Sequence, residues 1–178
     1  MSCSAQDSTG AIIVLMETTE TASGLARVFA ELVDGADAKG GFVLNRGDVG
    51  LLKSLNKLSA VDASRSTNGG ATIAAHAQHL RYGLSLMNEW AERGGDPFTN
   101  AKWDDAWKVS SVDEAAWTEI RHGLQHEAQD WLRRLSAPRE VTEMEYSGMI
   151  SSIAHFAYHL GAIRQINRDS RGPREGTF

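Results

Sequence analysis

Hydrophobic side chains recur every three or four residues in four long segments of the chain, a spacing that places them on one face of an α-helix. These segments run roughly over residues 12–33, 72–93, 111–137 and 142–168. The prolines all lie outside them, so we expect four uninterrupted helices. A further short helix or turn is expected over residues 50–58, and no segment has a pattern typical of a strand.

Residues that commonly begin or end helices stand at the predicted helix boundaries. Glycine pairs at 69–70 and 94–95 flank the second helix. The third and fourth helices each follow a Ser or Thr with a Glu three residues later, which is the spacing of a capping box. We therefore predict Ser111 and Thr142 as the N-caps of these two helices.

The longest irregular connection, residues 94–110, lies between the second and third helices and carries Phe98, Trp103 and Trp107. A connection of this length in a compact domain is often functional, but its aromatic side chains would also serve to cover one end of the helices. Both interpretations stay open at this point. Four long helices with one long connection predict an all-α protein with the architecture of a four-helix bundle.

Length and charge narrow the class of protein. With 178 residues we expect a single domain, 1–178, with the helices at about 12–168 and a short C-terminal tail at 169–178. The formal net charge of −5 argues against binding to nucleic acid or to an anionic membrane surface, because both need a basic face. Cys3 is the only cysteine and no apolar run approaches a membrane span, so we expect a cytoplasmic location.

The six histidines differ in the direction that they face. Two pairs have the four-residue spacing that places both rings on one side of a helix. His122 and His126 lie opposite the apolar stripe of the third helix, so we expect solvent exposure. His155 and His159 lie at the edge of the apolar arc of the fourth helix, so we expect them to face the interior.

The second helix adds His76 and His79 on its inward side. Burying several imidazoles together without partners costs free energy, and a shared metal ion removes most of that cost. The alternative is that each histidine is separately hydrogen-bonded in the core. We favour a metal site, although the spacing specifies no cysteine or acidic ligand.

Two segments resemble motifs of the DinB-like superfamily. The sequence TIAAHAQHL at 72–80 resembles its second-helix motif, and HFAYHLGAIRQ at 155–165 resembles its last-helix HxxxH motif. The resemblance extends from about residue 12 to 172 and implies a four-helix bundle with up-down-down-up connectivity, often dimeric. It also implies one divalent metal ion (nickel, zinc or iron) bound by His79, His155 and His159.

The chain departs from the family pattern at two places. Ala162 replaces the Gln that commonly follows the HxxxH motif, and Arg164 and Gln165 follow it instead. His76 beside His79 is either a second-shell group or an alternative third ligand.

Family members of known activity use low-molecular-weight thiols, as in bacillithiol transferases and mycothiol-dependent isomerases. The resemblance therefore implies a homodimeric, metal-dependent thiol transferase or related enzyme with a thiol cosubstrate. The alternatives are a metal-stabilised stress-response protein without a substrate, and a non-catalytic module that binds a small ligand beneath Trp90, Trp103 or Trp107. We name Trp90 and Arg164 as candidate substrate contacts, with Arg164 either holding an anionic group or pairing with a carboxylate.

Overall fold

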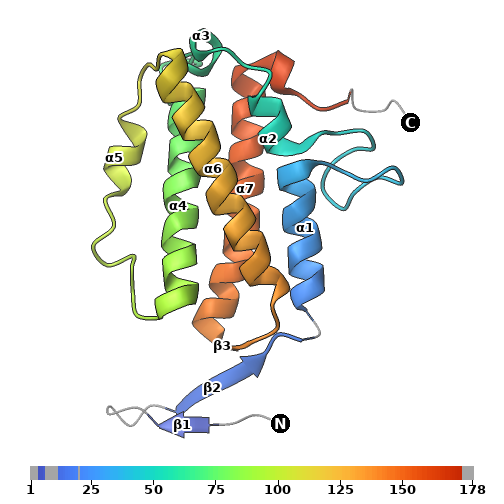
Figure 1. Ribbon diagram of the computed structural model, residues 1–178, viewed down its shortest axis with the longest axis vertical. Helices are drawn as coiled ribbons and strands as arrows, with labels where there is room; N and C mark the ends of the chain where they lie inside the picture. The colour runs from blue at the N-terminus through green and yellow to red at the C-terminus, as the bar shows by residue number, and fades with distance from the viewer. Residues whose placement is uncertain (1–3, 7–11, 20, 174–178) are drawn as a thin grey trace.

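The computed structural model describes residues 4–6, 12–19 and 21–173, and it is mostly helical. Four long helices lie side by side along the long axis of the molecule (Figure 1). They are α1 (Ala22–Asp34), α4 (Ile73–Arg93), α6 (Glu114–Ser136) and α7 (Glu143–Ile166). Short helices connect them: α2 (Gly50–Leu55), α3 (Ala60–Ala63), α5 (Trp103–Trp107) and the 3₁₀ helix η1 (Arg168–Ser170).

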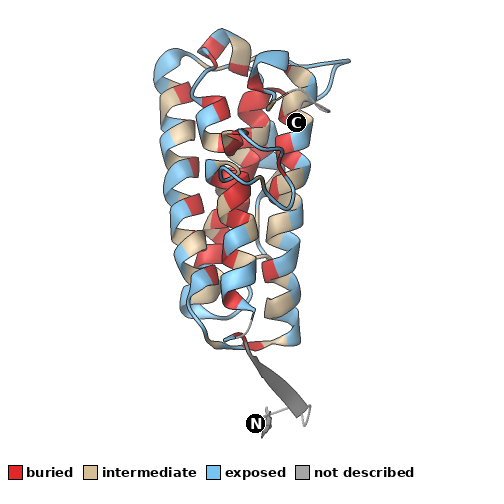
Figure 2. Ribbon diagram, turned by 90° about the vertical axis from the view of Figure 1, so that its right-hand side faces the viewer, coloured by how far each residue is buried: buried red, intermediate tan, exposed pale blue. Residues whose placement is uncertain are grey.

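The four long helices enclose one hydrophobic core. Helix α6 contacts α1 and α4, and α7 contacts the same two helices from the other side. Buried residues therefore line the inner faces of all four helices (Figure 2). Trp117 and Trp131 are fully buried, and their indole N–H groups donate to Leu58 O and Ser152 Oγ, both at 2.9 Å. The prediction of an all-α protein is confirmed at this level.

Two helix boundaries were predicted correctly, the start of α7 and the end of α4. Thr142 caps α7 in a complete capping box with Glu145, and the backbone leaves α4 through Gly94 at a positive φ of 68°. The predicted N-cap of α6 is wrong. Asp113 caps this helix by accepting a hydrogen bond from Ala116 N at 2.8 Å, while the preceding Val112 N donates to Ser64 Oγ, which keeps that backbone outside the helix.

The N-terminal segment contradicts the predictions that a helix begins near residue 12 and that the chain has no strand. Strand β2 (Ile12–Glu17) pairs antiparallel with β1 (Ser4–Gln6) and with β3 (Glu140–Thr142), in the order β1-β2-β3. The two N-terminal strands project beyond the end of the helices (Figure 1). A short apolar run fits a strand as well as a helix, and its partner lies more than a hundred residues away in the sequence.

The residues after α7 return toward that helix. Arg171 Nε donates to Arg164 O at 2.9 Å, so the described part of the predicted tail packs on the molecule. Cys3 and residues 174–178 lie outside the described residues. Among the described helices, none combines the length and the apolar character that crossing a membrane would require.

Candidate metal centre

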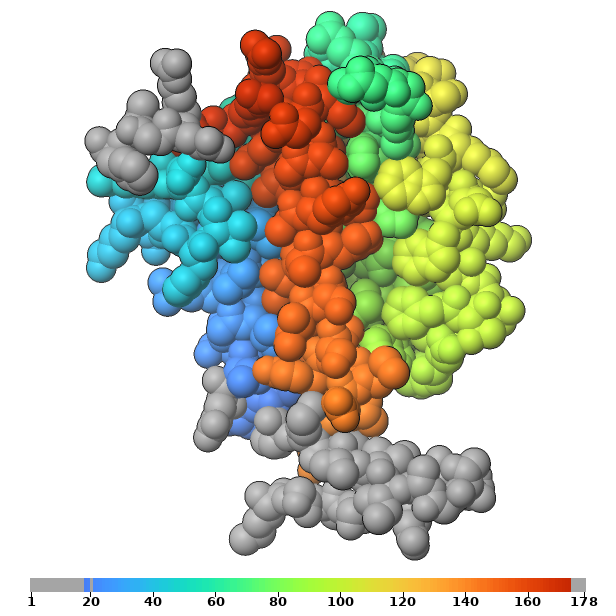
Figure 3. Space-filling view, turned by 180° about the vertical axis from the view of Figure 1, so that it is seen from behind, coloured from blue at the N-terminus to red at the C-terminus, as the bar shows by residue number. Residues whose placement is uncertain are grey.

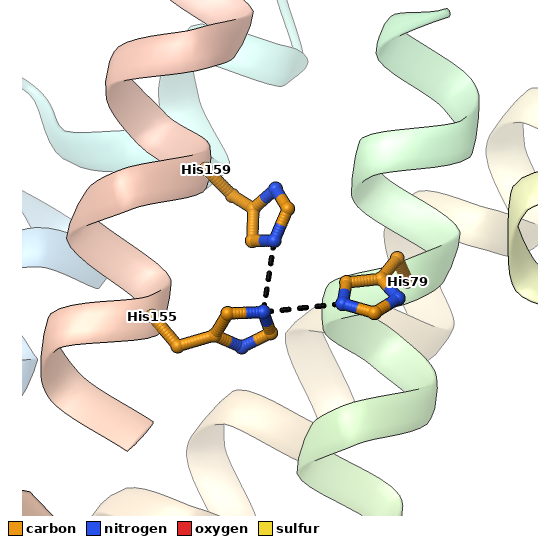
Figure 4. A group of neighbouring side chains, drawn as sticks. All are labelled: His79, His155 and His159. Carbon is orange, nitrogen blue, oxygen red and sulfur yellow. Dashed lines mark hydrogen bonds between the residues drawn. The ribbon is translucent and has the colours of Figure 1, made fainter. Parts of the chain in front are cut away.

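Three histidines from two helices point toward one another in the interior (Figure 4). His155 and His159 stand one turn apart on α7, and His79 faces them from α4, which packs against α7. His79 and His159 are buried, and His155 is half-buried. We call these residues the histidine trio.

The nitrogen atoms of the trio lie at distances suited to a shared cation. His155 Nε2 is 3.1 Å from His79 Nε2 and 2.9 Å from His159 Nε2, and one ligand atom of each residue lies within 4.8 Å of the others. Imidazole nitrogens bound to one ion at about 2.0–2.1 Å lie roughly 2.9 Å apart at a right angle and roughly 3.4 Å apart at the tetrahedral angle. The two measured distances fall within that range.

Hydrogen bonds alone cannot satisfy all three Nε2 atoms of the trio. A neutral imidazole nitrogen carries either one proton or one lone pair, so His155 Nε2 can make one good hydrogen bond with only one of its two neighbours. In addition, His79 Nδ1 is buried and has no hydrogen-bond partner among the described residues. A cation that accepts three lone pairs would remove the conflict at the Nε2 atoms. The residues present therefore fit a metal ion.

The protonation of these rings also favours a cation. Burial lowers the pKa of His159 to about 3 and that of His79 to about 4, and the neighbouring imidazoles add to both effects. Burial likewise lowers the pKa of His155 and of His76. All four rings are therefore neutral at pH 7, with a lone pair available on each.

His76 lies behind the trio and not within it. Its Nδ1 is 2.9 Å from Nδ1 of His159, the ring nitrogen opposite the one that faces the trio. If His159 Nε2 carries the lone pair for a metal, its Nδ1 carries a proton and donates to His76 Nδ1. Of the two roles predicted for His76, this geometry fits a residue that hydrogen-bonds a metal ligand and does not bind the metal itself.

Aromatic rings from α5 cover the trio. The Trp107 ring stacks on His79 with centroids 4.2 Å apart and an interplanar angle of 24°, and it meets His76 edge-on at 5.4 Å. Trp103 also lies 5.4 Å from His79. The long connection at 94–110 therefore lies against the histidines, along the side of α4 and α7 (Figure 3). The sequence is compatible with either role of this connection, and helical periodicity gives no sign that Trp107 stacks on His79.

A cavity of about 600 Å³ begins at His155 and runs between α4, α7 and the residues before α5. Trp90, one of the two candidate substrate contacts, lies in its wall, as does Gly83. A Cβ atom at Gly83 would stand 3.6 Å from Trp103 and 3.9 Å from His155, which are ordinary contact distances, so this position lies directly against both rings. Gly83 lies four residues after His79, which is the spacing that could have indicated its place at the site.

The other candidate substrate contact, Arg164, forms an ion pair with another residue of the chain. Its guanidinium binds the buried carboxylate of Asp48 through two hydrogen bonds of 2.7 and 2.8 Å. Of the two roles left open, the pairing with a carboxylate is the one that the structure has. His122 and His126 are exposed on α6, as predicted.

Comparison of the chain with protein-family models, with curated proteins and with solved structures finds no match in any of the three. The function of this protein is therefore inferred from the geometry of the histidine trio, its aromatic cover and the adjoining cavity.

Proposed function

We propose that this protein binds one divalent metal ion through Nε2 of His79, His155 and His159, and that it is a metal-dependent enzyme. The convergence of these three nitrogens, two pairs of them 2.9 and 3.1 Å apart, is the observation that carries the proposal. His76 accepts a hydrogen bond from Nδ1 of His159 and so fixes the orientation of that ring, and Trp107 shields His79 by stacking on its ring.

Three imidazoles leave at least one coordination position open, and a metal ion lowers the pKa of a water or a thiol that binds there. Open positions are typical of catalytic sites, whereas structural zinc sites are closed by four protein ligands. No cysteine occurs near the trio among the described residues, so a thiol nucleophile would have to come from a cosubstrate.

We further propose that the chain has the DinB-like four-helix architecture and that the thiol transferases and isomerases of that superfamily indicate its reaction class. Support comes from the HxxxH spacing on α7, from the single histidine ligand on α4, and from the contacts of α6 and α7 with both α1 and α4. The course of the long helices in Figure 1 agrees with up-down-down-up connectivity.

The chain offers a matched control for a test of metal binding. His155/His159 and His122/His126 are two pairs with the same four-residue spacing, one facing inward and one exposed. We expect wild-type protein equilibrated with Ni²⁺, Zn²⁺ or Fe²⁺ and then desalted to retain one ion per chain by elemental analysis. The exposed double variant, His122→Ala with His126→Ala, should retain the same amount, and the inward double variant should retain none.

Loss of metal in the exposed variant, or its absence from wild type and both variants, would contradict the proposal. Circular dichroism spectra of all three proteins establish that they are equally folded. The reaction class is tested separately, by consumption of a low-molecular-weight thiol in the presence of an electrophile. An absence of turnover in protein that carries metal would leave metal binding intact and favour the two non-catalytic alternatives, a metal-stabilised stress-response protein or a ligand-binding module.

A further inference from the structure

The cavity beside the histidine trio has the size and the walls of a small-molecule site. Its volume of about 600 Å³ lies within the range of roughly 300–1,000 Å³ that is typical of ligand pockets. Most of the surface is apolar. The large apolar side chains come from α4, from the connection that ends in α5, and from the first turn of α7: Leu80, Leu84, Met87, Trp90, Phe98, Trp103 and Met144.

Two aromatic rings in the wall of the cavity contact each other. Trp90 and Phe98 meet edge to face with centroids 5.3 Å apart. Gly148 on α7 permits this position of Trp90, because a Cβ atom there would stand 2.6 Å from the indole ring. Aromatic rings favour edge-to-face and offset contacts with other rings, so these walls suit a flat aromatic ligand.

The lining offers no cation to an anionic ligand. Among the described residues that line the cavity, Asp96 alone carries a charge. Its carboxylate already accepts hydrogen bonds from Phe98 N, Thr99 N and Thr99 Oγ1. In the metal-free protein, a sulfonate, phosphate or carboxylate among these apolar walls would lose hydration without gaining a positively charged side chain as its partner, which is costly. The cavity therefore favours a neutral ligand.

Hydroxyl groups on α7 lead from the opening of the cavity toward the trio. Ser147, Ser151 and His155 follow one another at four-residue spacing and all three line the cavity. The side chains of Ser147 and Ser151 make no hydrogen bond with another described residue. In contrast, Ser152 accepts from Trp131 and donates to Met149 O. Two free hydroxyls thus remain for one polar substituent of a ligand.

We infer that this cavity binds a neutral aromatic molecule, with its rings among Trp90, Phe98 and Leu84 and its polar substituent directed along Ser151 toward His155. The inference deepens the proposed function by naming the substrate class of the metal centre. The binding of the rings, however, rests on the cavity alone and needs no metal ion, so the two ideas can fail separately.

Two fluorescent probes that differ by one group test the inference on metal-free protein. N-phenyl-1-naphthylamine is neutral, and 8-anilinonaphthalene-1-sulfonate has the same rings with an added sulfonate. We expect the neutral probe to bind at one site, at least about tenfold more tightly than the sulfonate. Equal or tighter binding of the sulfonate would overturn the inference.

A cavity-filling variant locates the site. Ser151→Phe places a ring in the cavity from an exposed position on α7, and Gln125→Phe adds the same ring to the exposed face of α6. We expect Ser151→Phe to lower the affinity for the neutral probe by at least about tenfold and Gln125→Phe to leave that affinity unchanged. Unweakened binding to Ser151→Phe would overturn the inference, provided that its melting curve shows a folded protein. The variant Ser151→Leu serves if Ser151→Phe does not fold.

The position of the probe relative to the metal is tested with 1-fluoronaphthalene and protein loaded with Co²⁺ or Zn²⁺. Paramagnetic Co²⁺ should accelerate the transverse ¹⁹F relaxation of the bound probe relative to Zn²⁺, and Ser151→Phe should abolish the difference. Equal relaxation rates in the two loaded proteins would overturn the placement beside His155. If the chain bound no metal, the proposed function would fail, while the two naphthylamine probes would still decide whether the cavity binds a neutral aromatic ligand.

Discussion

Each buried imidazole brings two ring nitrogens, and the partners of those nitrogens distinguish the residues at this site. The Nε2 atoms of the trio face one another, whereas His159 uses its Nδ1 to contact His76. A residue that hydrogen-bonds the far nitrogen of a ligand, as His76 does, orients that ligand without binding the metal. The roles of His76 and His79 can therefore be separated by experiment.

The variants His76→Ala and His79→Ala should weaken metal binding to different extents. Loss of a second-shell hydrogen bond typically lowers metal affinity by about 10–100-fold, so His76→Ala should still bind one ion when metal is in excess. His79→Ala removes a ligand and should bind far more weakly than His76→Ala. Competition titrations against a chelator measure both affinities. The reverse order of affinities would make His76 the third ligand.

The metal-free protein should lose stability as the pH falls. Burial holds the pKa of His79 at about 4 and that of His159 at about 3, whereas both rings titrate near 6.5 in an unfolded chain. Below about pH 6.5 the unfolded state takes up protons that the folded state does not, so the free energy of unfolding falls between pH 6.5 and pH 4.

Urea denaturation in the presence of a chelator at pH 7.5, 6.5 and 5.5 measures this effect. The double variant His79→Gln with His159→Gln should show a shallower decline with falling pH. Identical slopes for the two proteins would show that these histidines do not carry the pH dependence.

The inward direction of His155 and His159 could be predicted from the sequence, because helical spacing fixes the face on which a residue lies. Helical spacing does not fix ring orientation, so it could not show that Nδ1 of His76 meets Nδ1 of His159. Nor could it decide between the two roles of Arg164, because Asp48 comes from a connection whose course the hydrophobic pattern does not determine.

Secondary-structure elements were predictable where local signals agree. Thr72 and Thr142 cap the N-termini of α4 and α7, and a glycine follows the C-terminus of α4. The sequence therefore marks both ends of α4 and the start of α7, the two helices that carry the trio. The N-terminal segment lacks such signals. Its assignment to β2 depends on pairing with β3, a contact between distant parts of the chain that no local pattern contains.

Helix α6 provides a test of the corrected cap. Asp113→Ala removes the side chain that accepts from Ala116 N and should lower the free energy of unfolding by about 1 kcal/mol. Ser111→Ala should change it by less than about 0.5 kcal/mol, because Ser111 is exposed and lies outside the helix. Denaturant unfolding curves compare the two variants. A larger effect for Ser111→Ala would show that Ser111, and not Asp113, caps the helix.

A buried ion pair between Asp48 and Arg164 links the connection between α1 and α2 to α7. Asp48 accepts two hydrogen bonds from Arg164 and one more from Gly50 N at the start of α2. The side chain of Asp48 is only 3% exposed, so removing its partner would leave an uncompensated buried charge. The pair makes no hydrogen bond with the histidine trio.

Arg164→Met should therefore lower stability without removing the metal. Breaking a buried pair by truncating one partner typically costs about 3–5 kcal/mol, whereas an exposed pair contributes about 0–1 kcal/mol. Arg93→Met, which removes the exposed pair with Glu89, is the matched control. Thermal unfolding and elemental analysis give the two readouts. Loss of metal from folded Arg164→Met protein would instead connect this residue with the site.

Anomalous diffraction from metal-loaded crystals would show whether the histidine trio holds one divalent ion. We predict a single peak within about 2.0–2.3 Å of Nε2 of His79, His155 and His159, with His76 in contact with His159 and not with the ion. A peak at His122 and His126, or an interior without a peak in crystals grown with excess metal, would contradict the claim.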